Sequence, residues 1–173
     1  MVKKVLPIFL TFMILIGIQG MTLGAATQPA NAADLPDRDT VLQSIGQLEK
    51  NPFGPAADAA RDIVVRYTYE SSDVNVLLAP ELFPWYDQSV WSKILIVSYM
   101  AGNVRSQLER HKNENDSYAG LLTMIGTYQA IQRNDPSFKI ADIDKLVGLS
   151  NQKKLQQYVT DLLKTIKIDS KAK

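Results

Sequence analysis

The sequence has no cysteine and only one histidine. Without cysteine, the chain forms no disulfide, carries no lipid on a cysteine, and offers no thiol nucleophile, zinc-binding thiolate or iron–sulfur ligand. The one histidine, His111, cannot build a multi-histidine metal site, and any serine–histidine–aspartate triad would have to use it. It follows a long apolar stretch and has a basic residue on each side, which favours a cation at a helix C-terminus.

Several catalytic motifs are missing as well. The chain has no Gly-x-Ser-x-Gly sequence, and no glycine-rich run leads into a lysine followed by serine or threonine. Two pairs of carboxylates occur, Asp142 with Asp144 and Glu114 with Asp116. Residues two apart do not face each other across a cleft, so these pairs indicate solvated charge or helix caps. We therefore expect no cofactor, no metal and no enzymatic activity; an enzyme that uses only Asp, Glu, Tyr and Arg is our third hypothesis.

Charge of one sign is also scarce. The chain has 19 basic and 18 acidic residues, for a net charge of +1. Lys3 and Lys4 are the only charged residues before position 33, so the rest of the chain has 17 basic and 18 acidic residues. No basic patch of the kind that binds nucleic acid is evident, and we expect no nucleic-acid partner.

What is present begins with a typical secretory leader. Lys3 and Lys4 form a basic start, residues 5–18 are uncharged and mostly apolar, and Ala30-Asn31-Ala32 fits the small-x-small rule for signal peptidase. We interpret residues 1–32 as a signal peptide. Export without cysteine is typical of a bacterial protein, which predicts a periplasmic or secreted location.

Two alternatives stay open for this leader. Cleavage after Ala26 would use the Gly24-Ala25-Ala26 sequence, which lies closer to the apolar run. An uncleaved anchor would use residues 5–23, because a spanning helix needs ~20 apolar residues. Residues 33–38 are interpreted as a linker, and after cleavage no membrane span is expected.

The remaining apolar residues recur with helical spacing, which predicts an all-α fold. We expect a compact bundle of five to six helices around one long central helix, with residues 39–169 as the domain and 170–173 as a flexible tail. Gly148 is expected to stop one helix and Ser150 to cap the next. A short strand or extended piece is expected at 74–78. The predicted helices span 39–50, 56–69, 88–111, 117–133, 141–147 and 150–168.

The long helix at 88–111 has a packing seam and one irregularity. The seam comprises Val90, Ile94, Val97, Ala101, Val104 and Leu108. Within it, Gly102-Asn103 is unusual, since glycine inside a helix costs ~1 kcal/mol relative to alanine. One interpretation is the close approach of another helix at Gly102. The other is a kink that points Asn103 into a polar pocket beside Arg105 and Gln107.

Large aromatic residues are concentrated in the segment 82–91, where Pro80 and Pro84 restrict the chain. The ring-bearing residues are Phe83, Trp85, Tyr86 and Trp91. Such a segment either plugs one end of a helical core or presents rings to a partner. In the binding interpretation, Trp85 and Tyr86 are partly exposed, while Trp91 is more buried and supports them.

These observations predict an exported, non-enzymatic helical domain that acts through protein–protein interaction in the cell envelope. The alternative is an extracytoplasmic protein that binds a small molecule or lipid in an apolar pocket beside the aromatic segment. The expected partner is thus another envelope protein or an apolar small ligand. The candidate binding residues are Phe83, Trp85, Tyr86, Asn103 and Arg105.

Overall fold

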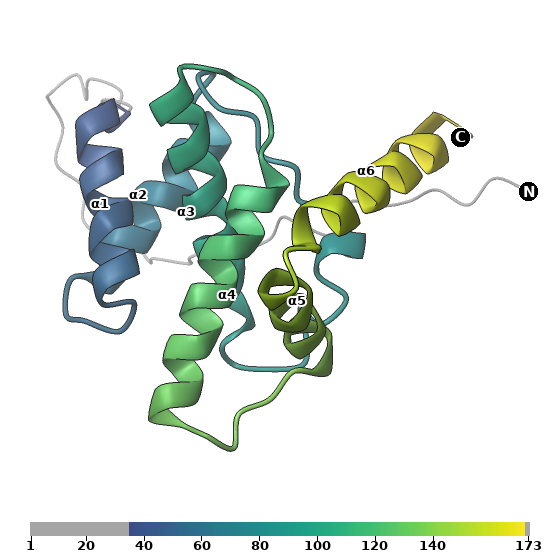
Figure 1. The fold of residues 1–173 in the computed structure, drawn as a ribbon. Coiled ribbons are helices and arrows are strands. Elements are labelled where there is room, and N and C mark those ends of the chain that lie inside the picture. Colours follow the sequence, from purple (N-terminus) through teal and green to yellow (C-terminus); the bar gives the residue numbers. More distant parts are fainter. Residues whose placement is uncertain (1–34, 172–173) are drawn as a thin grey trace, which may run out of the picture. The chain divides into compact units, whose positions relative to one another are not determined.

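The computed structural model describes residues 35–171, with side chains described through Ile166. This part of the chain forms six α-helices and one short 3₁₀ helix (Figure 1). No β-strand occurs within residues 35–171, which confirms the predicted all-α class. The predicted signal peptide, residues 1–32, lies outside the described residues. The elements are α1 (Arg38–Lys50), α2 (Ala57–Glu70), η1 (Pro80–Leu82), α3 (Ser92–Arg110), α4 (Ser117–Asn134), α5 (Ala141–Asn151) and α6 (Leu155–Lys171).

Three helices begin and end within one residue of their predicted bounds, namely α1, α2 and α4. Local capping explains two of these starts. The carboxylate of Asp37 accepts the backbone N–H of Thr40 at 2.7 Å, and that of Asp116 accepts the N–H of Ala119 at 3.0 Å. Each bond satisfies a donor that the first turn of a helix leaves without an intrahelical partner.

The long helix starts later than predicted. It begins at Ser92 rather than at residue 88, because the hydroxyl of Ser89 accepts the backbone N–H of Trp91 at 3.1 Å and holds a turn there. Val90 lies in this turn and is 89% exposed, so its assignment to the packing seam is wrong. The later seam residues Ala101, Val104 and Leu108 are buried as predicted.

The boundary between α5 and α6 also differs from the prediction. Gly148 does not stop α5, which continues to Asn151, and Ser150 lies inside that helix instead of capping the next one. The chain reverses at Lys153, whose φ of 57° is left-handed, while the N–H of Lys154 bonds to the carbonyl of Leu149 at 2.8 Å. This pattern resembles a Schellman-type ending. Helix α6 then runs to Lys171, so it extends into the expected tail at 170–173.

Helix α3 occupies the centre of the bundle and contacts α1, α2 and α4. Its two sides contribute to two different clusters of buried side chains. The N-terminal core contains Val41, Ile45, Val64, Val104 and Leu108, among others. The C-terminal core contains Trp85, Leu95, Tyr99, Met124, Tyr128 and Ile143, among others. The prediction of one long central helix is therefore confirmed, although it separates two cores instead of filling one.

Helices α3 and α4 approach closely at two glycines. A Cβ atom at Gly102 would lie 2.3 Å from Oγ1 of Thr123 and 2.5 Å from the carbonyl oxygen of Ala119. A Cβ atom at Gly120 would lie 2.6 Å from the ring of Tyr99. Both distances are shorter than van der Waals contact, so only glycine fits. The close-approach interpretation of Gly102 is thus confirmed. None of the described helices has the length and apolar character that a membrane span requires.

Candidate functional site

The aromatic segment, residues 82–91, was the first candidate site. Phe83 and Trp85 are buried, and Trp85 has no exposed surface. The ring of Phe83 makes edge contacts with the rings of Trp85 and Tyr99, with centroid separations of 5.9 and 4.9 Å. Trp85 therefore lacks the partial exposure that the binding interpretation requires. Its indole closes the C-terminal core, which agrees with the core-plug interpretation.

A small cavity lies beside Trp85. Its volume is about 40 Å³, and Leu82, Leu121 and Leu162 contribute to its lining. The indole N–H of Trp85 has no hydrogen-bond acceptor among the described residues. Small-molecule sites usually have volumes of ~300–1,000 Å³, so this space suits a water molecule rather than a lipid or metabolite. The alternative function would need a much larger space beside this segment.

The exposed part of the aromatic segment is its turn before α3. Tyr86 is 58% exposed, in agreement with the prediction. Trp91 is only half-buried, and its ring packs edge-on against Phe53 at a centroid distance of 5.4 Å. Trp91 is therefore less buried than Trp85, which reverses the expected order. The burial of Trp85 leaves Tyr86 as the ring of this segment that a partner can reach most easily.

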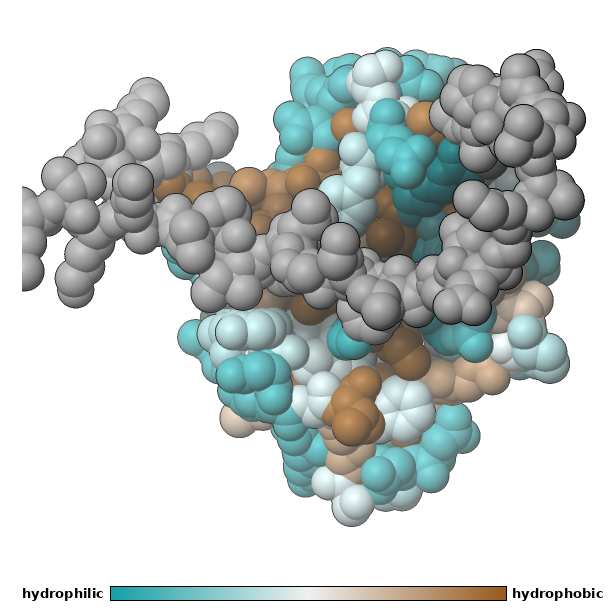
Figure 2. All heavy atoms as spheres, turned by 180° about the vertical axis from the view of Figure 1, so that it is seen from behind, coloured by the Kyte–Doolittle hydropathy of each residue, from teal (hydrophilic) through white to brown (hydrophobic). Residues whose placement is uncertain are grey.

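Exposed apolar side chains are spread over several segments. Among the described residues, the large apolar side chains that are exposed are those of Leu35, Tyr69, Tyr86, Val90 and Leu122. They come from the start of the domain, α2, the turn before α3, and α4. Figure 2 shows one face of the molecule, on which apolar residues outside the grey atoms occur in groups among hydrophilic and intermediate ones. Because these exposed apolar side chains come from several segments, they do not by themselves define a binding surface.

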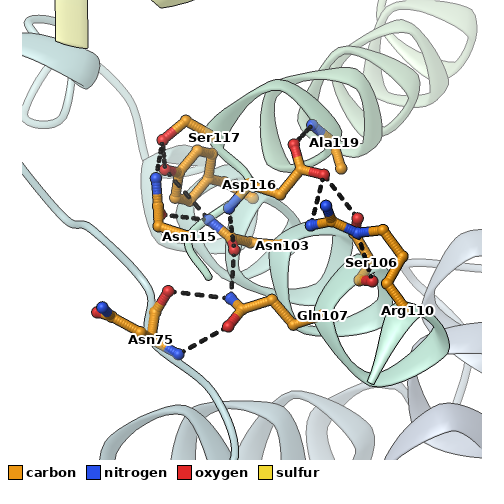
Figure 3. Close-up of polar contacts among 10 residues, drawn as sticks. Asn75, Asn103, Ser106, Gln107, Arg110, Asn115, Asp116, Ser117 and Ala119 are labelled. Atoms are coloured by element: carbon orange, nitrogen blue, oxygen red, sulfur yellow. Dashed lines mark hydrogen bonds and ion pairs between the residues drawn. The ribbon is translucent and has the colours of Figure 1, made fainter. Parts of the chain in front are cut away.

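The second candidate, Asn103, lies at the centre of a buried hydrogen-bond network (Figure 3). Its Nδ2 donates to Oδ1 of Asn115 at 2.8 Å. Its Oδ1 accepts Nε2 of Gln107 at 2.7 Å and the backbone N–H of Asp116 at 2.9 Å. Asn103 therefore faces a polar environment that includes Gln107, as one interpretation predicted. Its hydrogen bonds are already made within the protein, which assigns it a structural role.

The network fastens the extended segment 74–78 to the bundle. The side-chain amide of Gln107 accepts the N–H of Asn75 at 2.8 Å and donates to its carbonyl at 2.9 Å. Oδ1 of Asn115 accepts the N–H of Leu77 at 2.9 Å, and the hydroxyl of Tyr99 donates to the carbonyl of Leu77 at 3.0 Å. Side chains thus pair with this backbone as a neighbouring strand would, which explains an extended segment without a sheet.

Burial in this network changes the chemistry of Tyr99. Its hydroxyl is also within 2.8 Å of the Ser117 hydroxyl. Burial raises the pKa of Tyr99 to about 12, even though the hydrogen bonds with Ser117 and Asn103 act in the opposite direction. The phenol therefore stays protonated near neutral pH and serves as a hydrogen-bond donor. A phenol in this state is not suited to act as a general base.

Arg105 faces away from the Asn103 network, so the structure does not bring these two predicted residues into one site. Its Nη2 lies 3.1 Å from the Glu49 carboxylate on α1, and its Nη1 lies 3.9 Å from Glu109 on its own helix. Burial raises the pKa of Glu49, and the positive charge of Arg105 opposes this shift. Arg105 therefore holds a half-buried carboxylate in place between α1 and α3.

Glu49 belongs to a groove that the sequence analysis missed. The groove lies between the C-terminal end of α1 and one face of α4, and it has a volume of about 480 Å³. Its lining includes Lys50 and Pro52 on one side, and Leu122, Gly126, Ala130 and Arg133 from α4. A Cβ atom at Gly126 would meet nothing within 4 Å, so the groove is open at that point.

A periodic signal for this groove exists in the sequence. Leu122, Gly126 and Ala130 recur every four residues and therefore share one face of α4. That face differs from the one that buries Leu121 and Tyr128. This face has one large apolar residue and two small ones, which is too weak a pattern to indicate a surface groove from the sequence alone.

Other candidate chemical groups occupy structural positions. His111 is the C-cap of α3, with a left-handed φ of 52°, in agreement with its predicted place at a helix end. Asp116 caps α4, and Asp144 accepts the hydroxyl of Tyr128 at 2.8 Å. Within the described part of the chain, no group of three or more His, Cys, Asp or Glu residues is placed to hold a metal ion.

Comparisons with models of protein families, with curated proteins and with solved structures find no match to this chain.

Proposed function

We propose that this chain is an exported, non-enzymatic helical domain that binds another protein of the cell envelope, and that it does so through the groove between α1 and α4. The observation that carries the proposal is the groove itself. Its volume of about 480 Å³ is that of a typical small-molecule pocket, ~300–1,000 Å³, which is also enough space to receive side chains of a docked segment. The cavity beside Trp85 is about 40 Å³, so the groove is the better candidate.

The lining of the groove suits a polypeptide. Leu122 is 37% exposed at the groove and offers an apolar contact, while Thr123, Thr127 and Gln129 offer hydroxyl and amide groups. Small side chains at Gly126 and Ala130 let another backbone approach α4 closely. Protein interfaces typically combine an apolar contact with a polar rim in this way.

Export rests on the leader sequence. When the full chain is produced in a bacterium, we expect it to lose about 3 kDa and to be recovered from the periplasmic fraction. A chain of full mass that stays in washed membranes would support the anchor alternative and contradict the proposal.

Docking is tested by placing a photoreactive amino acid at Gly126 in the full chain, within its cells of origin. Gly148 provides a matched control, because a Cβ atom there also meets nothing within 4 Å and the residue lies on α5, outside the groove. We expect a discrete crosslinked product from position 126 that is absent from position 148. Equal products from both positions, or none from position 126, would contradict docking in the groove.

A further inference from the structure

The two ends of the groove differ in chemistry. On α4, Leu122 and Arg133 are separated by about 16 Å along the helix axis, given a rise of about 1.5 Å per residue. Lys50 is the last residue of α1, and α1 and α4 run in the same direction (Figure 1). Helix α1 ends beside the middle of α4, and α4 continues beyond it, so Lys50 and Arg133 line the middle and the C-terminal part of the groove, while Leu122 lies at the other end.

The charges that line the groove do not cancel. Glu49 is the one acidic residue of the lining, and its carboxylate is held by Arg105 at 3.1 Å. Lys50 and Arg133 have no ion-pair partner among the described residues. Asp135 lies near Arg133 in sequence, but its carboxylate accepts the hydroxyl of Ser137 at 2.6 Å and caps its own turn.

The helix dipoles reduce this positive charge without removing it. Each helix C-terminus is equivalent to about −0.5 of an elementary charge, and Lys50 and Arg133 each lie in the last turn of their own helix. Two whole positive charges exceed two such half charges. The part of the groove that Lys50 and Arg133 line is therefore electropositive, because the helix dipoles offset only part of their positive charge.

We infer that the groove binds an acidic peptide segment of the partner protein, with carboxylates along the part that Lys50 and Arg133 line and a large apolar side chain over Leu122 at the opposite end. An extended segment of about five residues covers the 16 Å between these ends. This inference rests on the proposed function and adds the chemistry and orientation of the partner. Charge complementarity is the argument for an acidic occupant, because it favours one sign of charge and suppresses the other.

Two synthetic hexapeptides test the inference. Each has a leucine at one end and small residues in the middle; one ends in two glutamates and the other in two lysines. Each is titrated into the 15N-labelled chain recovered from the periplasm, and amide shifts are recorded by NMR. We expect the acidic peptide to shift the amides of Leu122, Gly126 and Arg133. The basic peptide should bind at least about fivefold more weakly than the acidic one.

Variants of the chain show where the peptide binds and whether its affinity depends on the charges of the groove. Gly126→Trp fills the open part of the groove and should abolish the shifts, whereas Gly148→Trp should leave them unchanged. The double variant Lys50→Glu with Arg133→Glu should weaken the acidic peptide about five- to tenfold and reverse the preference. All of these positions accept changes at the surface, and a thermal melt of each variant checks that the fold is retained.

The outcomes separate this inference from the proposed function. Equal binding of both peptides, binding that survives Gly126→Trp, or no binding of the acidic peptide would overturn the acidic-segment inference. Binding to vesicles that contain anionic lipid, lost in Gly126→Trp and without peptide binding, would assign the groove to a membrane surface and also overturn it. If the peptide results alone overturn the acidic-segment inference, a protein crosslinked at position 126 in cells would still support docking in the groove. Its absence would contradict the proposed function itself.

Discussion

The connection between α2 and α3 is fastened to the bundle in two different ways along its length. Residues 74–78 are held by side-chain amides, which pair with the backbone of Asn75 and Leu77. Residues 82–91 are held by rings, above all by Trp85, which has no exposed surface. Both parts lack regular secondary structure apart from η1, yet one is anchored by hydrogen bonds and the other by buried apolar surface.

The difference teaches how much stability each kind of anchor provides. A typical intramolecular hydrogen bond contributes about 0.5–1.5 kcal/mol net, because the unfolded chain bonds to water instead. Truncating a buried large aromatic residue costs about 3–5 kcal/mol. We therefore expect the rings to dominate global stability, and the amides to fix the register and local order of the segment they hold.

The largest expected effect tests the aromatic anchor. Trp85→Ala should lower the free energy of unfolding by about 3–5 kcal/mol, because it removes an indole from the C-terminal core and leaves a cavity. Tyr86→Ala is the matched control, since that ring is 58% exposed, and it should change stability by no more than about 0.5 kcal/mol. Urea denaturation measures both. Similar losses for the two variants would contradict the core-plug interpretation.

The next effect is a loss of stability at high pH that depends on Tyr99. This residue belongs to both anchors, because its ring contacts Phe83 and its hydroxyl donates to the carbonyl of Leu77. Burial raises the pKa of Tyr99 from 10.0 to about 12 in the folded chain. The unfolded chain therefore releases this proton first. The contribution is present in full below pH 10 and is lost as the pH rises towards 12, by roughly 3 kcal/mol.

Denaturation at a series of pH values checks this prediction. Tyr99→Phe should make the decline between pH 10 and 12 shallower, although some decline should persist because burial also raises the pKa of Tyr128 to about 12. An unchanged slope in Tyr99→Phe would show that the phenol of Tyr99 does not account for the decline.

A smaller effect tests the amide anchor. Gln107→Met keeps most of the side-chain volume but removes the bonds to the backbone of Asn75, and it should lower stability by about 1–3 kcal/mol. Hydrogen exchange should show where the loss falls. We expect the amide of Asn75 to lose protection more than the amides of the C-terminal core do, whereas Trp85→Ala should reduce protection throughout that core. The reverse pattern would contradict the view that Gln107 holds residues 74–78 locally while Trp85 supports the whole C-terminal core.

Sequence reasoning located the helices well where local signals and packing agreed. The starts of α1 and α4 follow from Asp37 and Asp116, whose caps are local. It failed where distant contacts decide. Trp85 is buried because α4, α5 and α6 converge on it, and no pattern within residues 82–91 encodes that. Asn103 similarly bonds to Asn115 and Asp116 in the turn between α3 and α4, outside its own helix, so only the irregularity at Gly102 was visible.

The candidate site shows the same limit. Leu122, Gly126 and Ala130 share a face of α4 by their spacing alone, but Lys50 and Pro52 reach that face only through the packing of α1 beside α3. A groove made by two elements has no periodicity of its own. Charged residues at helix ends also have an ordinary explanation in the helix dipole, which conceals any additional role.

The smallest expected effect concerns the rim of the amide network. Arg110 pairs with the Asp116 carboxylate at 3.1 Å and donates to the carbonyl of Ser106 at 3.1 Å, but its side chain is 44% exposed. Water replaces such a partner readily, so Arg110→Ala should change stability by no more than about 0.5–1 kcal/mol. Asp116 retains its bonds to Ala119 and Ser106 in that variant, so its cap on α4 persists. Raising the salt concentration should shrink the difference between Arg110→Ala and the parent chain, whereas it should leave the loss in Gln107→Met unchanged, because the Gln107 bonds carry no net charge. A salt-independent loss in Arg110→Ala as large as that in Gln107→Met would show that the rim anchors the segment as strongly as its buried amides do.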